Sequence, residues 1–232
     1  MKTFCFFVCL VVTLLEVNFV SATVVFRDGQ THNIDYQIGA EVEIDRNTPE
    51  RYTTLNLVAN GSITYDITGF CDSRINVIGG TARNVFVWGN CDCSMSAGYA
   101  AALVVADDGI ITFTGGQTEQ IIGYETGHML VSGGHLGALR IQEGSHAIIE
   151  GFGFAVDGFP FEGELLSINK LGYSSDPIRR ITGTLANGDT LNADFQIGNS
   201  AYIALNTVPE PTTAGLLISG LAVLLLRHHR RK

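Results

Sequence analysis

Gly79-Gly80-Thr81-Ala82-Arg83-Asn84-Val85-Phe86-Val87 opens a stretch, ending at Phe152, in which the sequence pattern returns at every eighteenth position. Glycine returns at this step in two adjacent series: Gly79/Ala97/Gly115/Gly133/Gly151 and Gly80/Gly98/Gly116/Gly134. Four further columns stay apolar or small: Ile75/Cys93/Ile111/Met129/Ala147, Val77/Met95/Phe113/Val131/Ile149, Val85/Leu103/Ile121/Leu139 and Val87/Val105/Gly123/Ile141. Within a repeat these columns fall in pairs two residues apart, which is the period of a strand with one buried face.

A short repeat of fixed length predicts a solenoid, in which like side chains form ladders from coil to coil. We therefore expect an all-β protein built as a single-stranded parallel β-helix with 18-residue coils. The repeat covers residues 63–152, about five coils. Glycine pairs permit positive φ and tight corners, which favours a three-sided coil. The general chirality of parallel connections favours a right-handed one.

The segments on either side of the repeat lack its period. We expect residues 23–62 to form a first coil and an N-terminal cap, and residues 153–206 to form a C-terminal β module. Within that module, Asn187-Gly188 predicts a hairpin between Arg180–Leu185 and Thr190–Ile197.

Both ends of the chain have the composition of targeting signals. Residues 1–22 are typical of a secretory signal peptide, with Lys2, an apolar core over Phe4–Leu15 and small residues before the cleavage site. Residues 207–232 contain Pro209-Glu210-Pro211, a short hydrophobic helix over Ala214–Leu226, and a basic tail that includes Arg227, Arg230, Arg231 and Lys232. The apolar run is shorter than the ~20 residues that a resident membrane span needs.

This C-terminal arrangement resembles the PEP-CTERM sorting signal of Gram-negative bacteria. The resemblance implies that an exosortase-type membrane protease is a partner that recognises Pro209, Glu210 and Pro211. It also implies an exported protein at the cell surface or in an exopolysaccharide matrix, with a precursor held transiently in the membrane at its C-terminus.

A wider resemblance covers most of the chain between the two signals. The phrases Phe26-Arg27-Asp28-Gly29-Gln30-Thr31-His32, Asp72-Ser73-Arg74-Ile75-Asn76-Val77-Ile78-Gly79-Gly80 and Thr182-Gly183-Thr184-Leu185-Ala186-Asn187-Gly188 resemble those of repetitive exported proteins of planctomycete-type bacteria. The coils here are degenerate, because Asp72-Ser73 alone keeps the dipeptide of that family. The resemblance implies shape and location, and it implies no activity.

The charge of the chain excludes one class of partner. Residues 23–211 carry 22 Asp and Glu against 9 Lys and Arg, a formal charge near −13. Nucleic-acid binding requires clustered Lys and Arg, so we expect none.

The acidic residues include stacked turn positions that suggest a cation site. Asp107, Glu125 and Glu143 form one column, beside a second column of Asp72/Asn90/Asp108/Thr126. Stacked carboxylates repel one another, and a Ca²⁺ ion would reverse that effect. The alternative is that these side chains are solvated turn residues, and we expect no resident cofactor.

Three other outward or near-corner features have two interpretations each. His128 and His146 lie one repeat apart and either bridge a metal with Glu125 and Glu143 or are outward polar positions. Trp88 and Tyr124 share a column with Ala106 between them, suited to stacking on sugar rings or to corner packing. Cys93 is expected to be a small buried residue, and Cys71 and Cys91 lie too far apart, at ~8 Å between Cα atoms, for an unstrained disulfide.

These observations predict a non-enzymatic, structural or adhesive β-solenoid of the cell surface or extracellular matrix. Two alternatives stay open: a β-helix enzyme that acts on polysaccharides, and a Ca²⁺-dependent module that binds glycans or other ligands.

Overall fold

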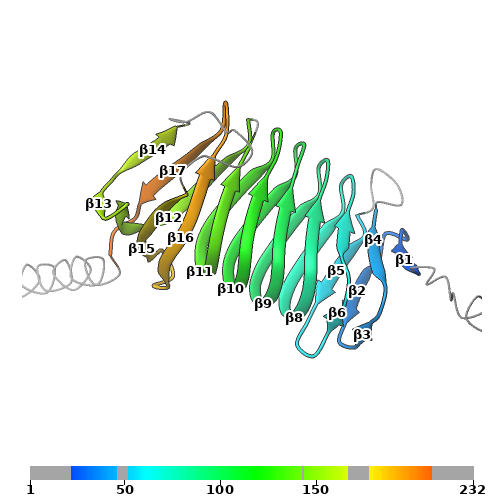
Figure 1. Ribbon diagram of the computed structural model, residues 1–232. Helices are drawn as coiled ribbons and strands as arrows, with labels where there is room; N and C mark the ends of the chain where they lie inside the picture. Colours follow the sequence, from blue (N-terminus) through cyan, green and yellow to red (C-terminus); the bar gives the residue numbers. More distant parts are fainter. Residues whose placement is uncertain (1–21, 46–51, 143, 167–177, 211–232) are drawn as a thin grey trace, which may run out of the picture.

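The chain folds as a stack of β coils (Figure 1). The computed structural model describes residues 22–45, 52–142, 144–166 and 178–210. Within these residues the protein is all-β, contains no helix and forms a β-solenoid of about seven turns. The predicted fold class is therefore confirmed.

The fixed period of the sequence corresponds to long strands that pair in parallel. Four of them have 14 residues each: β8 (Arg74–Val87), β9 (Asp92–Val105), β10 (Ile110–Gly123) and β11 (His128–Ile141). Outside the glycine corners, successive strands pair at the step of the repeat, as in Ile75↔Cys93 and Phe113↔Val131. All four predicted apolar columns face the core, and most of their side chains are completely buried.

Each coil is divided into three segments. Along β8, the alternation of buried and exposed residues changes phase at the double glycine and again between Ala82 and Val85. The coil then closes through a short turn after Val87. The second glycine of each pair has the positive φ that the corner was expected to need, from +67° at Gly80 to +88° at Gly134. The right-handed sense of the coil stays a prediction.

The parallel stack extends further toward the N-terminus than the fixed period indicates. Seven short strands build these coils: β1 (Thr23–Phe26), β2 (Thr31–Ile34), β3 (Gln37–Ile38), β4 (Glu41–Ile44), β5 (Thr54–Leu57), β6 (Ser62–Ile63) and β7 (Ile67–Gly69). β5 pairs with β8 at Thr54↔Arg74, and β2 pairs with β5 at Thr31↔Thr54. These partners are thus 20 and 23 residues apart, so a search for the 18-residue period of the later coils does not find them.

An asparagine ladder marks the register of these early coils. The Asn76 side-chain amide donates to the Asn56 Oδ1 at 2.8 Å, and the Asn56 amide donates to the Asn33 Oδ1 at 2.7 Å. Each asparagine amide has both a donor and an acceptor, so every side chain in the ladder can hydrogen-bond to the asparagine of the next coil. Three asparagines at unequal spacing were the sequence signal that would have found these coils.

The C-terminal module closes the other end of the stack. It consists of β12 (His146–Val156), β13 (Phe159–Pro160), β14 (Gly163–Leu166), β15 (Arg179–Leu185), β16 (Thr190–Ile197) and β17 (Tyr202–Thr207). β15 and β16 are the predicted antiparallel hairpin. β16 continues the stack in parallel on β11, β17 continues it in parallel on β12, and β14 pairs antiparallel with β17.

The tip of the hairpin is attached to a corner of the solenoid. The Gly134 backbone N–H donates to the Asp189 carboxylate at 2.6 Å, and the Asn187 N–H donates to the Ser132 carbonyl at 3.1 Å. Hydrogen bonds from the Asn187 side chain and from Gly134 lower the pKa of Asp189. The hairpin turn therefore fixes the module against the last double glycine.

No disulfide joins Cys71, Cys91 and Cys93 in the described part of the chain. Cys91 and Cys93 are buried, and burial raises the pKa of Cys91 to about 12. The Ser73 hydroxyl donates to the Cys91 sulfur at 3.2 Å. These two buried thiols are core residues without thiolate character.

Candidate functional site

The column of predicted metal ligands lies in the turns between coils. Asp107 and Glu125 occupy equivalent turn positions with φ of +53° and +52°, and Gly89 has the same position one coil earlier with φ +59°. The Gly89 N–H donates to the Asp107 Oδ2 at 3.4 Å. Glu143, the third predicted ligand, lies outside the described residues. No group of three or more His, Cys, Asp or Glu that could hold a metal ion occurs among the residues described.

The neighbouring polar column is stabilised by hydrogen bonds between its own members. The Asn90 amide donates to the Asp72 Oδ1 at 3.2 Å, and the Thr126 hydroxyl donates to the Asp108 Oδ1 at 3.1 Å. Donors and carboxylates thus alternate up the column. This arrangement relieves the carboxylate repulsion that a stack of Asp alone would have.

The turn geometry predicts that Glu125→Gly stabilises the protein. A non-glycine residue in the left-handed region costs ~1–2 kcal/mol, and glycine loses part of that gain through its larger unfolded-state entropy. We expect a net gain of ~0.5–1 kcal/mol, a rise of a few degrees in the midpoint of thermal unfolding.

The control for this prediction is Glu125→Gln, which removes the charge and keeps the strained backbone. The glutamine variant is expected to melt close to the parent. Equal stabilisation by both variants would mean that charge repulsion, not φ, is the cost at this turn. A Ca²⁺-dependent rise in melting temperature that both variants abolish would instead support the calcium hypothesis.

The two predicted stacking histidines are in direct contact. His128 begins β11 and His146 begins β12, and the two residues are register partners. The His128 Nδ1 lies 2.6 Å from the His146 Nε2, with the ring planes at 89°. Tyr202 of β17 is the next partner along this column and stacks on His146 at 5.0 Å between ring centroids. Sequence reasoning missed Tyr202, because it lies far beyond the repeat and follows no period.

An uncharged face extends over the third segment of β8, β9 and β10. Its outward residues are Asn84, Phe86 and Trp88 in one coil, Ala102, Val104 and Ala106 in the next, and Gln120, Ile122 and Tyr124 in the third. The Phe86 and Trp88 rings are nearly parallel, at 11° and 6.5 Å between centroids. Ala106 and Val104 are only 1% and 7% exposed although they point outward.

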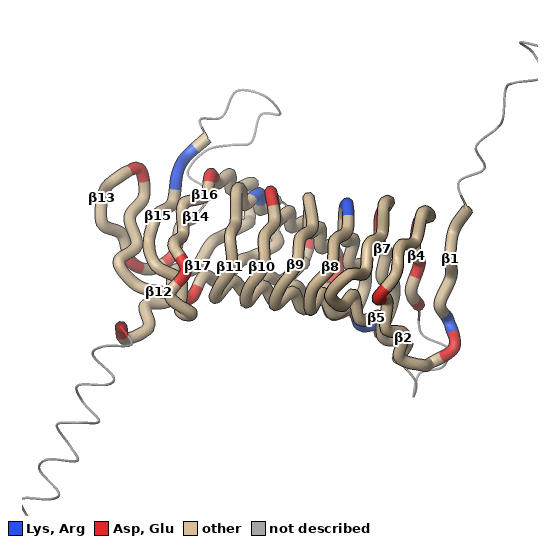
Figure 2. The backbone as a smooth tube through the Cα atoms, turned by 90° about the horizontal axis from the view of Figure 1, so that it is seen from below, with Lys and Arg blue, Asp and Glu red and all other residues tan. Residues whose placement is uncertain are grey.

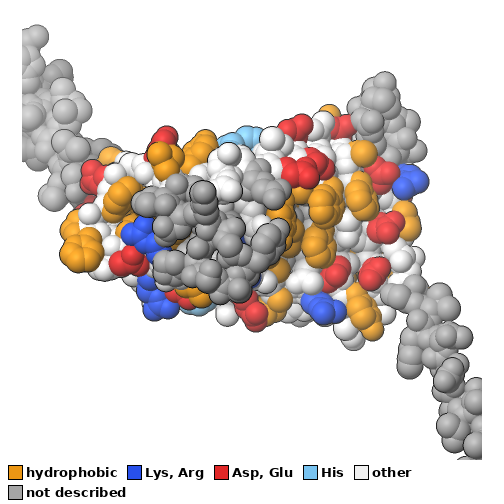
Figure 3. Space-filling model, turned by 45° about the horizontal axis from the view of Figure 1, so that its top comes forward, with side chains coloured by type: hydrophobic (Ala, Val, Ile, Leu, Met, Phe, Trp, Pro, Cys, Tyr) orange, Lys and Arg blue, Asp and Glu red, His pale blue; other side chains and the backbone are white. Residues whose placement is uncertain are grey.

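Figure 3 shows hydrophobic side chains in a cluster near the middle of the stack, with acidic and basic side chains beside it. The predicted column of Trp88, Ala106 and Tyr124 is thus part of a wider apolar surface, which we call the aromatic face. Phe86 and Ile122 belong to it as well, and the sequence column had not included them.

The permanent positive charges of the coils do not converge. Arg74 lies on the first segment, Arg83 on the second and Arg140 on the third, in line with Ile122. Figure 2 shows long uncharged stretches of backbone between such scattered charges along β8–β11. A surface hollow of about 290 Å³ on the first segment is lined by Arg74, Asn76, Asp92, Cys93, Ser94, Ile110 and Thr112. Asp92 is the sole carboxylate of this lining, and it faces Arg74 at 3.7 Å.

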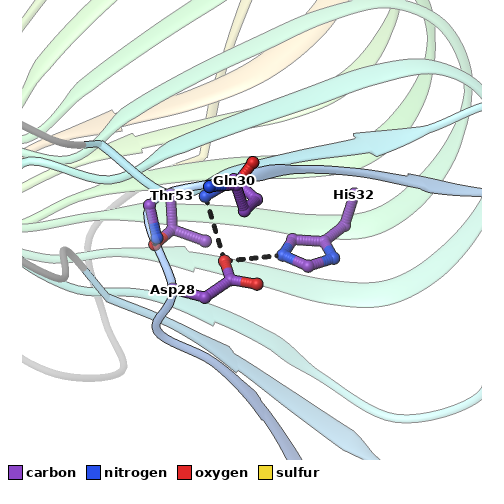
Figure 4. A network of polar contacts seen from close by, with 5 residues as sticks. Asp28, Gln30, His32 and Thr53 are labelled. Atoms are coloured by element: carbon purple, nitrogen blue, oxygen red, sulfur yellow. Dashed lines mark hydrogen bonds and ion pairs between the residues drawn. The ribbon is translucent and has the colours of Figure 1, made fainter.

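A second polar contact lies at the N-terminal end of the stack (Figure 4). The Asp28 carboxylate accepts the Gln30 N–H at 3.0 Å and faces the His32 Nε2 at 2.9 Å, while the Gly29 N–H donates to the Thr53 hydroxyl. The hydrogen bond with His32 lowers the pKa of Asp28. His32 also packs its ring on Phe26 at 4.2 Å, so this group serves as a cap on the first coil.

The two predicted targeting signals fall mostly outside the described residues. Pro209 and Glu210 follow β17, and Pro211, the apolar run, the basic tail and residues 1–21 lie beyond the described ranges. In the part of the chain that the structure describes, no helix has the length and apolar character needed to cross a membrane.

No protein-family model, curated protein or solved structure matches this chain.

Proposed function

We propose that the protein is a non-enzymatic structural and adhesive module, exported and placed at the cell surface or in the extracellular matrix. The observation that carries this proposal is the aromatic face on a continuous parallel stack. Backbone pairing fixes β8, β9, β10 and β11 to one another, so their outward side chains are held in a regular array. An array of this kind suits contact with an extended polymer rather than with one small molecule.

Neutral polysaccharide is the partner whose chemistry fits the aromatic face best. The outward residues of this face carry no charge, and aromatic rings there can stack on the apolar faces of sugar rings. Gln120 adds an amide group at one border, which can exchange hydrogen bonds with hydroxyl groups. The Asn84 amide at the same border already donates to the Asp66 Oδ1 at 2.8 Å. An acidic polysaccharide would find no cation among the residues of this face.

The test is affinity electrophoresis in native gels cast with dextran, galactomannan or hydroxyethylcellulose, and with alginate as the acidic comparison. We expect at least one neutral polymer to retard the protein. Trp88→Ala is expected to weaken retention roughly two- to tenfold, because one ring stack contributes ~0.5–1.5 kcal/mol. Tyr36→Ala is the matched control, since Tyr36 is an exposed aromatic (54%) outside the aromatic face.

Two results would redirect the proposal. Shortening of the polymer chains, seen as new reducing ends, would establish the alternative of a polysaccharide-active enzyme. Retention that disappears with EDTA and returns with CaCl₂ would establish the calcium-dependent alternative. Retardation by none of the polymers would contradict the adhesive part of the proposal.

The export part of the proposal rests on the two terminal signals and has its own test. We propose that an exosortase-type protease cuts the precursor at Pro209-Glu210-Pro211. In a host that carries such a protease, Glu210→Ala is expected to leave the uncut precursor in the membrane fraction. The parent chain is expected at the surface or in the matrix, and identical fractionation of both proteins would contradict this route.

A further inference from the structure

We propose that His128 and His146 form a two-histidine chelate for a divalent transition metal ion such as Ni²⁺, Zn²⁺ or Cu²⁺. This site is separate from the aromatic face, and no part of the adhesive proposal depends on it. The chelate joins two successive coils at the start of β11 and β12.

The geometry of the two rings brings one nitrogen of each side chain into direct contact. The Nδ1 of His128 faces the Nε2 of His146 at 2.6 Å, and the ring centroids are 4.0 Å apart. Zinc–nitrogen bonds are ~2.0–2.1 Å long, so two nitrogens on one tetrahedral ion lie ~3.4 Å apart. The pair therefore has to open by less than ~1 Å, which side-chain rotation provides without backbone movement.

The surrounding residues hold this arrangement in place. The backbones at His128 and His146 are register partners in a parallel pair, and β12 is paired on its other side with β17. Tyr202 lies nearly parallel to the His146 ring, at 5°, and so restrains its plane. The two chelating side chains thus lose little freedom when an ion binds.

The chemistry of the pair selects the class of ion. Imidazole suits zinc, nickel and copper, whereas Ca²⁺ and Mg²⁺ take oxygen ligands. Ile110 and Tyr202 are the column neighbours on either side of the pair, and neither is an acidic or basic residue that would compete for the ion. Two protein nitrogens leave the remaining positions of the ion to water.

The test is calorimetric titration of the full chain with NiCl₂ in a non-chelating buffer. All proteins carry His228→Gln and His229→Gln, because these adjacent histidines of the basic tail would bind metal themselves. Nickel is the probe, since Cu²⁺ would oxidise the exposed thiol of Cys71. We expect one ion per chain and no heat with CaCl₂.

Single-histidine variants separate the chelate from ordinary surface binding. His128→Gln and His146→Gln are each expected to weaken nickel binding at least tenfold, because loss of even a supporting residue around a metal ligand costs about 10–100-fold. His135→Gln and His32→Gln are matched controls and are expected to bind as the parent does. His128→Gln leaves the Tyr202 stack in place, so a loss of binding in it is not due to disturbed packing of β12 on β17.

A second readout distinguishes a chelate from weak adsorption. Saturating NiCl₂ is expected to raise the unfolding temperature of the parent, because an ion bound to the folded state alone stabilises it. The His128→Gln and His146→Gln proteins are expected to show no such rise. Unchanged nickel affinity in either variant, or equal losses in His135→Gln, would overturn the proposal.

Discussion

Gly98→Ala is expected to destabilise the protein by clearly more than the ~1–2 kcal/mol that an unfavourable φ alone costs an alanine. Gly98 has φ of +87°, so that backbone cost applies in full. Its added Cβ would also lie 2.5 Å from the Gly80 carbonyl oxygen and 2.6 Å from the Gly79 carbonyl oxygen. Both atoms are backbone of the preceding coil, so no rotamer change relieves the overlap. The two coils have to separate at this corner, and the pairing of β8 with β9 weakens beside it.

Gly153→Ala is the control that isolates the contact between coils. Gly153 also has positive φ, +64°, but its added Cβ would meet no atom within 4 Å. The Gly153→Ala protein is therefore expected to be less stable by the ~1–2 kcal/mol that the unfavourable φ costs an alanine, and by nothing more. Chemical denaturation followed by far-UV circular dichroism measures both variants. Equal destabilisation of the two would show that φ, and not the close approach of successive coils, requires glycine at the corner.

The part of the fold that the sequence predicts is the part in which one physical constraint recurs. Glycine is needed at one corner of each repeat coil, at Gly80, Gly98, Gly116 and Gly134, because the preceding coil leaves no room for a Cβ. An apolar or small side chain is needed at each inward position. These constraints repeat at the step of one coil, so the columns through Phe113 and Val85 could be read directly. In the coils of β2–β7 the register partners are between 18 and 25 residues apart, so no fixed step recurs. One glycine, Gly61, stands where most later coils have two.

The contacts that the sequence does not predict are those that join segments without a common period. The Asn187-Gly188 hairpin is a local feature and was predicted, but its attachment to Gly134 joins residues 55 positions apart. The same holds for the candidate sites. His128 and His146 are one repeat apart, so the sequence alone predicts that they are neighbours. Tyr202 reaches their column only because β17 continues the stack on β12.

Phe113→Asp is expected to unfold several coils together. Phe113 is completely buried in the column between Met95 of β9 and Val131 of β11, the two strands that flank β10. Its ring also lies against the Gly134 corner, where an added Cβ would be 2.6 Å from the ring. Truncation of a buried Phe to Ala typically costs ~3–5 kcal/mol. Aspartate adds an unpaired buried carboxylate, so the total approaches the ~5–15 kcal/mol by which a native protein is stable.

Because each coil packs only on its neighbours, the damage should spread to β9 and β11 rather than stay in β10. Hydrogen–deuterium exchange measures this directly, and we expect backbone amides of all three strands to lose protection. Thr112→Asp is the matched control: it places the same charge one residue earlier, on the outward side of the same strand. It is expected to keep protection close to that of the parent. A Phe113→Asp protein that melts and exchanges like Thr112→Asp would mean that the inward register of this column is wrong, and with it the ladder packing from which the whole solenoid was predicted.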